Sequence, residues 1–500
     1  MKRHPALWLT IVLAAFYILL GNGRTTSGDG EAMFQVTRAL AQQGRLDLSP
    51  GILPPIETVL ADSTDAQIPY TLVGQDERIY SKYGLGQSLA ALPLYLLGMA
   101  WRYVTDVAHA PRSAALLLNS LLTAGTAGLV VTLVRDLGYS ARTGVLLALA
   151  FALCSPAWVY THTFFSEPLV TLSLTGAALS AIRFAQGGKV RWLVLAGGAL
   201  GLALLTRLNA VAALPAFGLY LALTWHTQDR PFGVVLRQVA AALLAFSLGA
   251  GLMLLYNGIR FGNPLDFGYH TANWQTPFLR GLYGLTFSPG KGILWYAPVI
   301  VLGLFGLRPF FRRWPRETLL CAGVPAGYLL LHSAYTYWAG GWCWGPRLVL
   351  PALPFLLLPG SALLERRDLP QAAELGLAML LALGLIVQIP AVGGSYAHTL
   401  QQSYQASPDD FEARILYQPR HSPLIGQWTS FLQVTANLRG AGARAQLADL
   451  LGQAEPGDDV LLLADSPSEA LRIQRQAILA FNLPDLWLIS APWLRQDGTP

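Results

Sequence analysis

The residue types best suited to acid–base chemistry stand at the starts of two predicted helices. The motif Ser27-Gly-Asp-Gly-Glu31 opens a stretch whose apolar residues follow helical spacing as far as Gly44. This pattern predicts an amphipathic helix on a membrane surface. Asp29 would project from a glycine-flanked turn and act as a general base on an acceptor hydroxyl. Alternatively, Asp29 is only the N-cap, and Glu31 complements the helix dipole.

A second acid, Glu167, lies in the segment 160–168, where Pro168 opens the next apolar stretch. Helix capping explains a carboxylate at this position equally well. Because Glu167 is expected on the same side of the membrane as Asp29, it is a second catalytic candidate. His162 could join the two acids as a metal ligand, although a lone interfacial histidine is more often simply hydrogen-bonded.

Three groups of basic and aromatic residues could bind an anionic, sugar-bearing substrate. Lysine and arginine suit phosphate, and aromatic rings suit sugar stacking. The same residues also suit an anchor belt at the membrane interface. The candidates for substrate binding are Tyr80, Lys82, His270, Arg280, Lys291, Trp342, Trp344 and Arg347.

The composition places these residues in a membrane protein. Of 500 residues, 53% are hydrophobic and 12% are charged, whereas soluble domains carry about 25% charged residues. The composition excludes a disordered chain and a water-soluble nucleic-acid binder. Two of the three cysteines fall in apolar segments, so a disulfide framework is not expected.

Eleven apolar segments are long enough to cross a bilayer, which takes about 20 residues. The predicted spans are 5–21, 113–134, 143–161, 168–185, 190–206, 208–225, 236–257, 292–308, 318–337, 347–364 and 372–393. A twelfth apolar stretch, 85–103, contains Pro93. If it crossed, the basic cluster 308–316 would lie outside, against the positive-inside rule. We therefore expect 85–103 to be interfacial or re-entrant.

This topology predicts a polytopic all-α domain over residues 1–393, with its amino terminus inside and a large outer loop, 22–112. Residues 394–500 would form an outer carboxy-terminal region. In that region we predict strands at 459–465 and 487–490 and a helix at 466–481, which together would form a small α/β unit. The large loops all fall on the outer face, where we expect the chemistry.

The order of these motifs resembles the GT-C superfamily of integral-membrane glycosyltransferases, closest to the protein O-mannosyltransferase and aminoarabinose-transferase branch. Asp29 and Glu31 match the acidic pair of that branch's first loop, although here a glycine separates them, and this match makes Glu31 a third catalytic candidate. Lys82 matches its loop lysine, but Ser81 replaces the usual preceding acid. Glu167-Pro168 falls where the family has an acid before proline. The resemblance covers roughly residues 1–393.

The resemblance implies transfer of a sugar from a polyprenyl-phosphate donor to an acceptor hydroxyl, with inversion. Lys82 and Arg347 would hold the phosphate, helped by Arg280 or Lys291, and Asp29 would deprotonate the acceptor. Glu167 would orient the acceptor or share a divalent cation with Asp29. The partners would be the donor, the acceptor and the lipid bilayer, and no nucleic acid is expected. The expected location is the inner membrane of a bacterium.

Two other functions fit part of the pattern. A flippase or transporter for lipid-linked glycans would also have many spans and basic-aromatic patches. It should, however, carry ionisable residues within its spans and related halves. A ligase or polymerase for lipid-linked oligosaccharides would share the donor chemistry and stays open.

Overall fold

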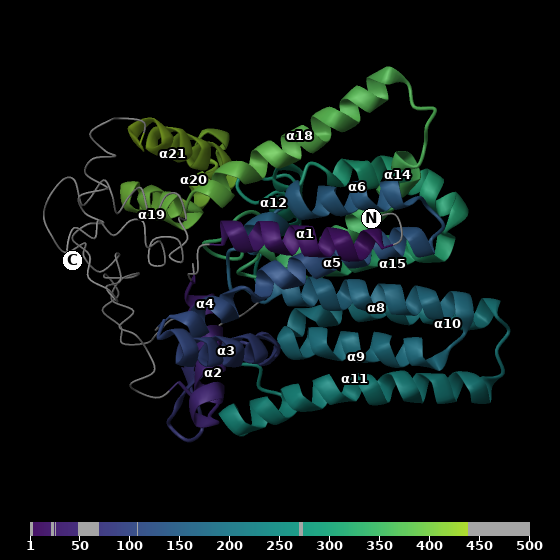
Figure 1. The fold of residues 1–500 in the computed structure, drawn as a ribbon, viewed down its shortest axis with the longest axis horizontal. Helices are drawn as coiled ribbons and strands as arrows, with labels where there is room; N and C mark the ends of the chain where they lie inside the picture. The colour runs from purple at the N-terminus through teal and green to yellow at the C-terminus, as the bar shows by residue number, and fades with distance from the viewer. Residues whose placement is uncertain are drawn as a thin grey trace, which may run out of the picture.

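The computed structural model describes residues 4–21, 25, 27–48, 70–107, 109–269 and 274–438. Over these residues the chain is a bundle of helices with one short hairpin (Figure 1). The long helices run along a common direction. They are α1 (Pro5–Leu20), α5 (Leu118–Asp136), α6 (Ala141–Leu153), α8 (Glu167–Gly187), α9 (Val190–Thr206), α10 (Leu214–Thr227), α11 (Phe232–Phe261), α14 (Ile300–Arg313), α15 (Pro315–Ser333) and α18 (Gln371–Gly393).

Among the described residues, six helical segments are long and apolar enough to cross a membrane. They are Ala110–Asp136, Glu167–Gly187, Leu208–Thr227, Phe232–Phe261, Arg347–Leu364 and Gln371–Gly393. The three shorter apolar helices are α1, α6 and α9. These nine segments coincide with nine of the eleven predicted spans, and α14 and α15 occupy the other two. The predicted all-α polytopic class is therefore confirmed.

Glycines allow two of the bundle helices to pack with their backbones in contact. A side chain at Gly197 or Gly201 of α9 would collide with the backbone of α11, and one at Gly249 of α11 would collide with Gly201. Small residues four apart are a common device for close helix packing in membranes, where the hydrophobic effect contributes little between helices. This contact holds α11 at the edge of the bundle.

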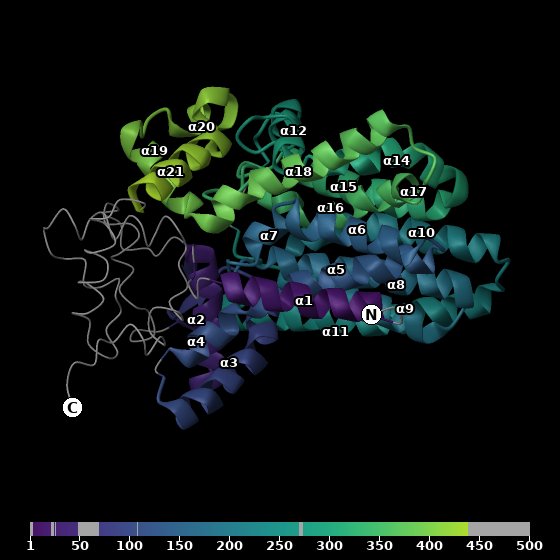
Figure 2. The same cartoon turned by 45° about the horizontal axis from the view of Figure 1, so that its top comes forward.

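A second layer of shorter elements covers one end of the bundle (Figures 1 and 2). It consists of α2 (Gly28–Gln43), α3 (Gly86–Thr105), α4 (Ala110–Leu116) and the antiparallel strands β1 (Thr71–Val73) and β2 (Ile79–Ser81). Helix α3 contains the stretch 85–103 and packs against α2 and α4. It is not among the six candidate spans, and its interfacial position stays a prediction.

Short helices connect the long ones. They are α7 (Ala157–Tyr160), η2 (Leu208–Ala213), α12 (Phe278–Thr286), α13 (Ile293–Tyr296), η3 (Arg347–Ala352), α16 (Leu353–Leu357), η4 (Leu358–Gly360) and α17 (Ser361–Leu364). The predicted span 347–364 is thus a succession of short turns because proline interrupts it at 351, 354 and 359.

The beginning of the carboxy-terminal region folds onto the bundle. Helices α19 (Tyr396–Ala406), α20 (Phe411–Tyr417), η5 (Pro419–His421) and α21 (Pro423–Leu438) lie at the same end as α2 and α4 (Figure 2). The backbone amide of Gly290 donates to the carbonyl of Leu416 at 3.3 Å, which ties α20 to the bundle. The predicted strands 459–465 and 487–490 and helix 466–481 lie outside the described residues.

Candidate active site

The first turn of α2 presents Asp29 to the interior. Ser27 is the N-cap, because its hydroxyl accepts a hydrogen bond from the amide of Gly30 at 3.1 Å. Gly44 ends the helix in the left-handed conformation, with φ of 65°, as the sequence predicted. The alternative role of Asp29 as N-cap is therefore wrong, and its carboxylate is available for other partners.

Asp29 is buried and paired with Arg347, which lies 318 residues further along the chain. Its Oδ2 accepts a hydrogen bond from Nη1 of Arg347 at 2.7 Å, and Tyr83 also hydrogen-bonds to the carboxylate. Burial alone would raise the pKa of Asp29. The charge of Arg347 and the hydrogen bonds from Tyr83 and Arg347 outweigh burial and hold the pKa below its ordinary value. Asp29 is thus ionised at neutral pH.

Glu167, at the start of α8, is the second acid of the same network. It has no exposed surface, and its Oε1 lies 2.7 Å from Nη1 of Arg207 and 3.4 Å from Nε of Arg347. The buried side chain of Asn119 fixes the preceding loop by donating to the carbonyls of Thr163 and Phe165 at 2.7 and 2.8 Å. The loop thereby directs Glu167 toward both arginines.

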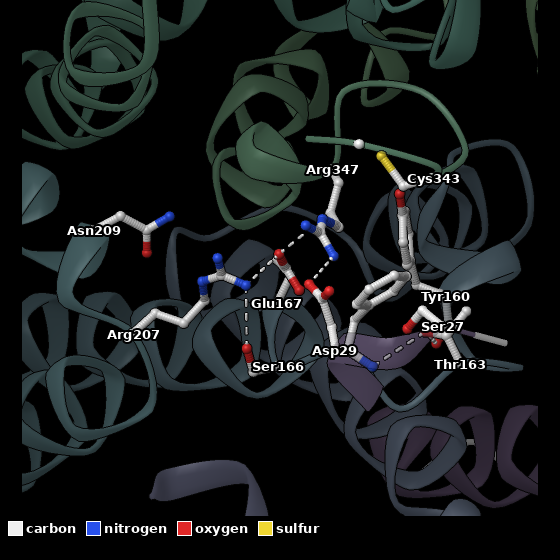
Figure 3. A network of polar contacts seen from close by, with 12 residues as sticks. Ser27, Asp29, Tyr160, Thr163, Ser166, Glu167, Arg207, Asn209, Cys343 and Arg347 are labelled. Atoms are coloured by element: carbon white, nitrogen blue, oxygen red, sulfur yellow. Dashed lines mark hydrogen bonds and ion pairs between the residues drawn. The ribbon is translucent and has the colours of Figure 1, made fainter. Parts of the chain in front are cut away.

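Four charged groups consequently alternate in sign along one row: Arg207, Glu167, Arg347 and Asp29 (Figure 3). They come from four separate segments: the α9–η2 junction, α8, the start of η3 and α2. Two polar atoms of this row, Oε2 of Glu167 and Nε of Arg347, are buried without a hydrogen-bond partner among the described residues. Such atoms normally find a partner in protein, water or ligand.

The loop that carries Arg347 is fixed from several sides. Gly340, Gly341 and Gly345 have φ of 73°, 72° and 63°, a conformation that glycine adopts at little cost. The buried ammonium of Lys291 donates to the carbonyls of Gly341 and Cys343 at 3.0 and 2.6 Å. Lys291, which we expected at the substrate phosphate, therefore anchors this loop instead.

Lys82 lies beside the row of charges. Its ammonium is 5.3 Å from the ring centre of Tyr70 and 5.4 Å from that of Tyr83. Burial is the main cause that lowers the pKa of Lys82, and the negative charge of Asp29 partly offsets it. Lys82 interacts electrostatically with Asp29 and Arg347, and its contact with a substrate phosphate stays a prediction.

Glu31 and Tyr80 belong to other contacts. Glu31 accepts hydrogen bonds from Arg112 at 3.1 and 2.7 Å, from Gln35 at 2.6 Å and from Thr25. Tyr80 donates to Asp76 at 3.0 Å within the hairpin. Neither side chain makes a described contact with the row of charges.

The remaining substrate-binding candidates also lie in other environments. Trp342 packs against Tyr404 and Phe411 of the carboxy-terminal helices. Trp344 is buried and donates to Gln388 at 3.1 Å, and Arg280 donates to the hydroxyl of Tyr417 at 3.0 Å. His270 lies outside the described residues.

The proposed metal ligands do not form a cluster. Among the described residues, no three His, Cys, Asp or Glu side chains are grouped so that they could hold a metal ion. His162 is buried with neither ring nitrogen hydrogen-bonded to a described residue, and burial lowers its pKa to about 4. The guanidinium of Arg347 itself lies between the carboxylates of Asp29 and Glu167 (Figure 3).

Sequence reasoning missed Arg207 and Tyr83 as site residues. Arg207 follows directly after an apolar helix of 17 residues and precedes another apolar segment. An ionisable residue between two apolar segments is by default a functional candidate, so this signal was present. Tyr83 gave no comparable signal, because tyrosines near a membrane surface are common.

Comparison with known proteins agrees with this architecture. The family model described as Dolichyl-phosphate-mannose-protein mannosyltransferase matches residues 95–250, less than half of the chain, and includes Glu167 and Arg207. A search of curated proteins finds no match. The crystal structure of ArnT from Cupriavidus metallidurans bound to undecaprenyl phosphate is similar with a TM-score of 0.50 and 14% identity, over 90% of this chain and 81% of that one.

The structure of the same ArnT in the apo state gives a TM-score of 0.49 and 16% identity, with the same coverage of 90% and 81%. At such identities the likeness to the undecaprenyl-phosphate-bound structure shows the fold. The predicted resemblance is thus confirmed at that level: the chain has a fold like that of ArnT, a GT-C glycosyltransferase of the aminoarabinose-transferase-like branch.

Proposed function

We propose that this protein is a membrane glycosyltransferase that moves a sugar from a polyprenyl-phosphate donor to an acceptor hydroxyl. The observation that carries the proposal is the buried row Arg207–Glu167–Arg347–Asp29 with Lys82 beside it. The fold shared with ArnT and the match to a mannosyltransferase family model support it. The ArnT structure with undecaprenyl phosphate supports a lipid-phosphate donor.

The charges of the site favour one negative charge on the ligand. Among the described residues, the group contains three cations, Lys82, Arg207 and Arg347, and two anions, Asp29 and Glu167. An unpaired charge in a buried site is costly unless a partner neutralises it. A sugar–phosphate–lipid diester carries one negative charge, whereas a diphosphate linkage carries two. The balance therefore favours a monophosphate-linked donor.

In the proposed reaction, Asp29 takes the proton of the acceptor hydroxyl. The acceptor oxygen bonds to the anomeric carbon as the bond from that carbon to the phosphate oxygen breaks. The bonding electrons leave with the polyprenyl phosphate, whose new charge Arg347 and Lys82 stabilise. Attack opposite the leaving group inverts the configuration of the sugar.

Binding of the donor would also activate the base. The phosphate competes with Asp29 for the guanidinium of Arg347, which now holds Asp29 at 2.7 Å. When Arg347 turns toward the phosphate, its charge and hydrogen bond no longer oppose the effect of burial on Asp29, and the pKa of Asp29 rises. A carboxylate with a higher pKa is a stronger base, so proton removal would become efficient only after the donor is in place.

Glu167 would position the other groups. It holds Arg207 and Arg347 through Oε1, and its unpartnered Oε2 can accept a hydrogen bond from the acceptor. Arg347 supplies the positive charge between the two acids, so the proposed steps use the cations of this chain. We place the reaction on the outer face of a bacterial inner membrane, with the amino terminus inside, because the basic residues of the loops favour that orientation.

The test supplies membranes that contain the protein with radiolabelled polyprenyl-phosphate sugars, one sugar at a time. Wild type should move label from one lipid donor to another product. Asp29→Asn should bind that donor without consuming it, and Glu31→Gln, changed two residues further along the same helix, should remain active. If wild type consumes no donor but moves labelled lipid across reconstituted vesicles, the protein is a flippase and the proposal is wrong.

A further inference from the structure

A row of aromatic residues leads from the surface of the protein to the charged site. Trp274 is 59% exposed and lies 5.7 Å from Tyr335, measured between ring centres. Tyr337, 53% exposed, also lies near Tyr335, with 5.8 Å between ring centres. Thr276 fixes the loop of Trp274, because its amide donates to the carbonyl of Ala334 at 3.2 Å and its hydroxyl to that of Tyr335 at 3.1 Å. Hydrogen bonds therefore hold the loop of Trp274 in place beside Tyr335.

The inner end of this row is polar. The ring of Tyr335 meets the edge of His332 at 6.4 Å, and Nε2 of His332 lies 3.2 Å from Nδ2 of Asn209. Asn209 and Arg207 lie next to one another in the close view (Figure 3), two residues apart in the chain. Tyr335 and His332 both interact electrostatically with Arg207. The aromatic row thus ends at Arg207, the first member of the charged row.

Two buried oxygens at this inner end have no hydrogen-bond partner among the described residues. They are Oδ1 of Asn209 and Oε2 of Glu167. A simple anchor belt at a membrane interface needs aromatic rings but no buried, unsatisfied acceptors behind them. Buried acceptors without a protein partner call for a ligand or water that can donate hydrogen bonds. The observations therefore favour a binding site over an anchor.

Resting on the proposed function, we infer that the acceptor is a saccharide and that this site holds its ring. A sugar ring has an apolar face that packs on aromatic side chains, and hydroxyls at its edge that donate to oxygens such as those of Asn209 and Glu167. Bound here, a saccharide would hold one hydroxyl close to Glu167 and toward Asp29. A serine or threonine peptide would bring one hydroxyl but no ring face for Trp274 and Tyr335.

The experiment measures binding directly, in the absence of donor. The full chain in nanodiscs is examined by saturation-transfer-difference NMR with methyl glycosides of hexoses and pentoses, and in parallel with a short serine- and threonine-containing peptide. At least one glycoside should receive saturation from wild type. Trp274→Ala should reduce that signal about fivefold or more, and Trp274→Phe should restore most of it.

Trp295→Ala is the matched control. Trp295 is similarly exposed, at 55%, but donates to the carbonyl of Phe287 at 2.8 Å and does not belong to the row. Its replacement should leave the glycoside signal unchanged. Equal losses in Trp274→Ala and Trp295→Ala, no glycoside signal in wild type, or signal from the peptide alone would each overturn the saccharide site. Consumption of the labelled donor by wild type, measured separately, shows in each case whether the proposed function still stands.

Discussion

Two ion networks, one around Asp29 and one around Glu31, begin on helix α2, and they differ in whether their carboxylate oxygens all have hydrogen-bond partners. Asp29 and Glu31 are two residues apart on α2, so their side chains point about 200° apart around the helix. Asp29 meets Arg347 inside the protein, whereas Glu31 meets Arg112 at 2.7 Å beside α4. Both pKa values lie below the ordinary range, because arginine and hydrogen bonds outweigh burial in each case.

The carboxylate of Glu31 is fully paired, although Oε1 of its partner Gln35 is buried without a hydrogen-bond partner among the described residues. Both oxygens of Glu31 are bonded, to Arg112, Gln35 and Thr25, and the side chain of Arg112 keeps 34% of its surface exposed. The row around Asp29 and Glu167 is open by comparison, because a carboxylate oxygen itself, Oε2 of Glu167, is buried without a described hydrogen-bond partner. A fully paired carboxylate holds a structure together, while an open one in a buried place is prepared for a ligand. The lowered pKa values of Asp29 and Glu31 do not by themselves distinguish the two networks, because both shift in the same direction.

The largest expected difference follows from the same substitution in each network. Glu167→Gln removes the anion between Arg207 and Arg347, which leaves the guanidinium of Arg207 without a carboxylate partner among the described residues and should cost about 3–5 kcal/mol of stability. Glu31→Gln acts on a partly solvated pair and should cost about 1 kcal/mol or less. Unfolding of the purified variants in detergent measures both values. Glu167→Asp, which keeps the charge, should recover much of the loss, and equal losses in the two Gln variants would contradict the comparison.

A second prediction concerns pH. In the free wild-type enzyme the pKa of Asp29 lies below its ordinary value, so the acidic limb of the transfer rate, measured as kcat/KM, should lie below about pH 4. In Arg347→Gln the charge and hydrogen bond that oppose burial most strongly are lost, the pKa of Asp29 rises, and the limb of the residual activity should move to higher pH. Arg112→Gln raises the pKa of Glu31 by the same logic but should leave the limb of the transfer rate in place. A pH–rate profile of wild type, Arg347→Gln and Arg112→Gln tests this prediction. An acidic limb that stays in place in Arg347→Gln would exclude Asp29 as the base.

Much of the fold could be predicted because membrane-spanning helices are recognisable in a sequence as long apolar runs. Nine of the spans coincide with apolar helices, and the helix 28–43 begins and ends where Ser27 and Gly44 indicate. Serine at the cap and glycine in the left-handed position are local signals that need no tertiary information. The succession of short turns over 347–364 was less visible, since hydropathy does not report how prolines divide a span.

The site was harder to predict because it depends on which sides of distant segments meet. Asp29, Glu167, Lys82 and Arg347 were identified as candidates, and the structure brings them together. Lys291 looked equally suitable in composition, yet its ammonium is used by carbonyls of the Arg347 loop. Arg207 was passed over because one arginine in a short loop resembles an ordinary flank. A sequence shows charge, but it does not show what each charge already binds.

Lys82 provides a third, intermediate effect. Lys82→Met should weaken binding of polyprenyl phosphate by about tenfold, because one charge-assisted contact to phosphate is lost. Burial lowers the pKa of Lys82 below its ordinary value near 10.4. In the free enzyme this lysine therefore loses its charge at a lower pH than an exposed lysine does. Donor affinity should fall as the pH rises through this lowered pKa. Lys82→Arg should keep its charge throughout and abolish the alkaline fall. Affinity measured between pH 7 and 10 tests this, and an identical fall in Lys82→Arg would assign it to another group.

The smallest effect is expected from Arg112→Lys. Arg112 meets both oxygens of Glu31 with two nitrogens, at 3.1 and 2.7 Å, and its guanidinium lies 4.7 Å from the ring centre of Phe34. Lysine keeps the charge but cannot form the fork, so the unfolding free energy should fall by about 1 kcal/mol. Transfer should stay within about twofold of wild type, because Glu31 would only hold α2 against α4. A much larger loss of transfer at intact stability would instead give Glu31 the catalytic role that the sequence motif indicated, and the two networks would then form one site.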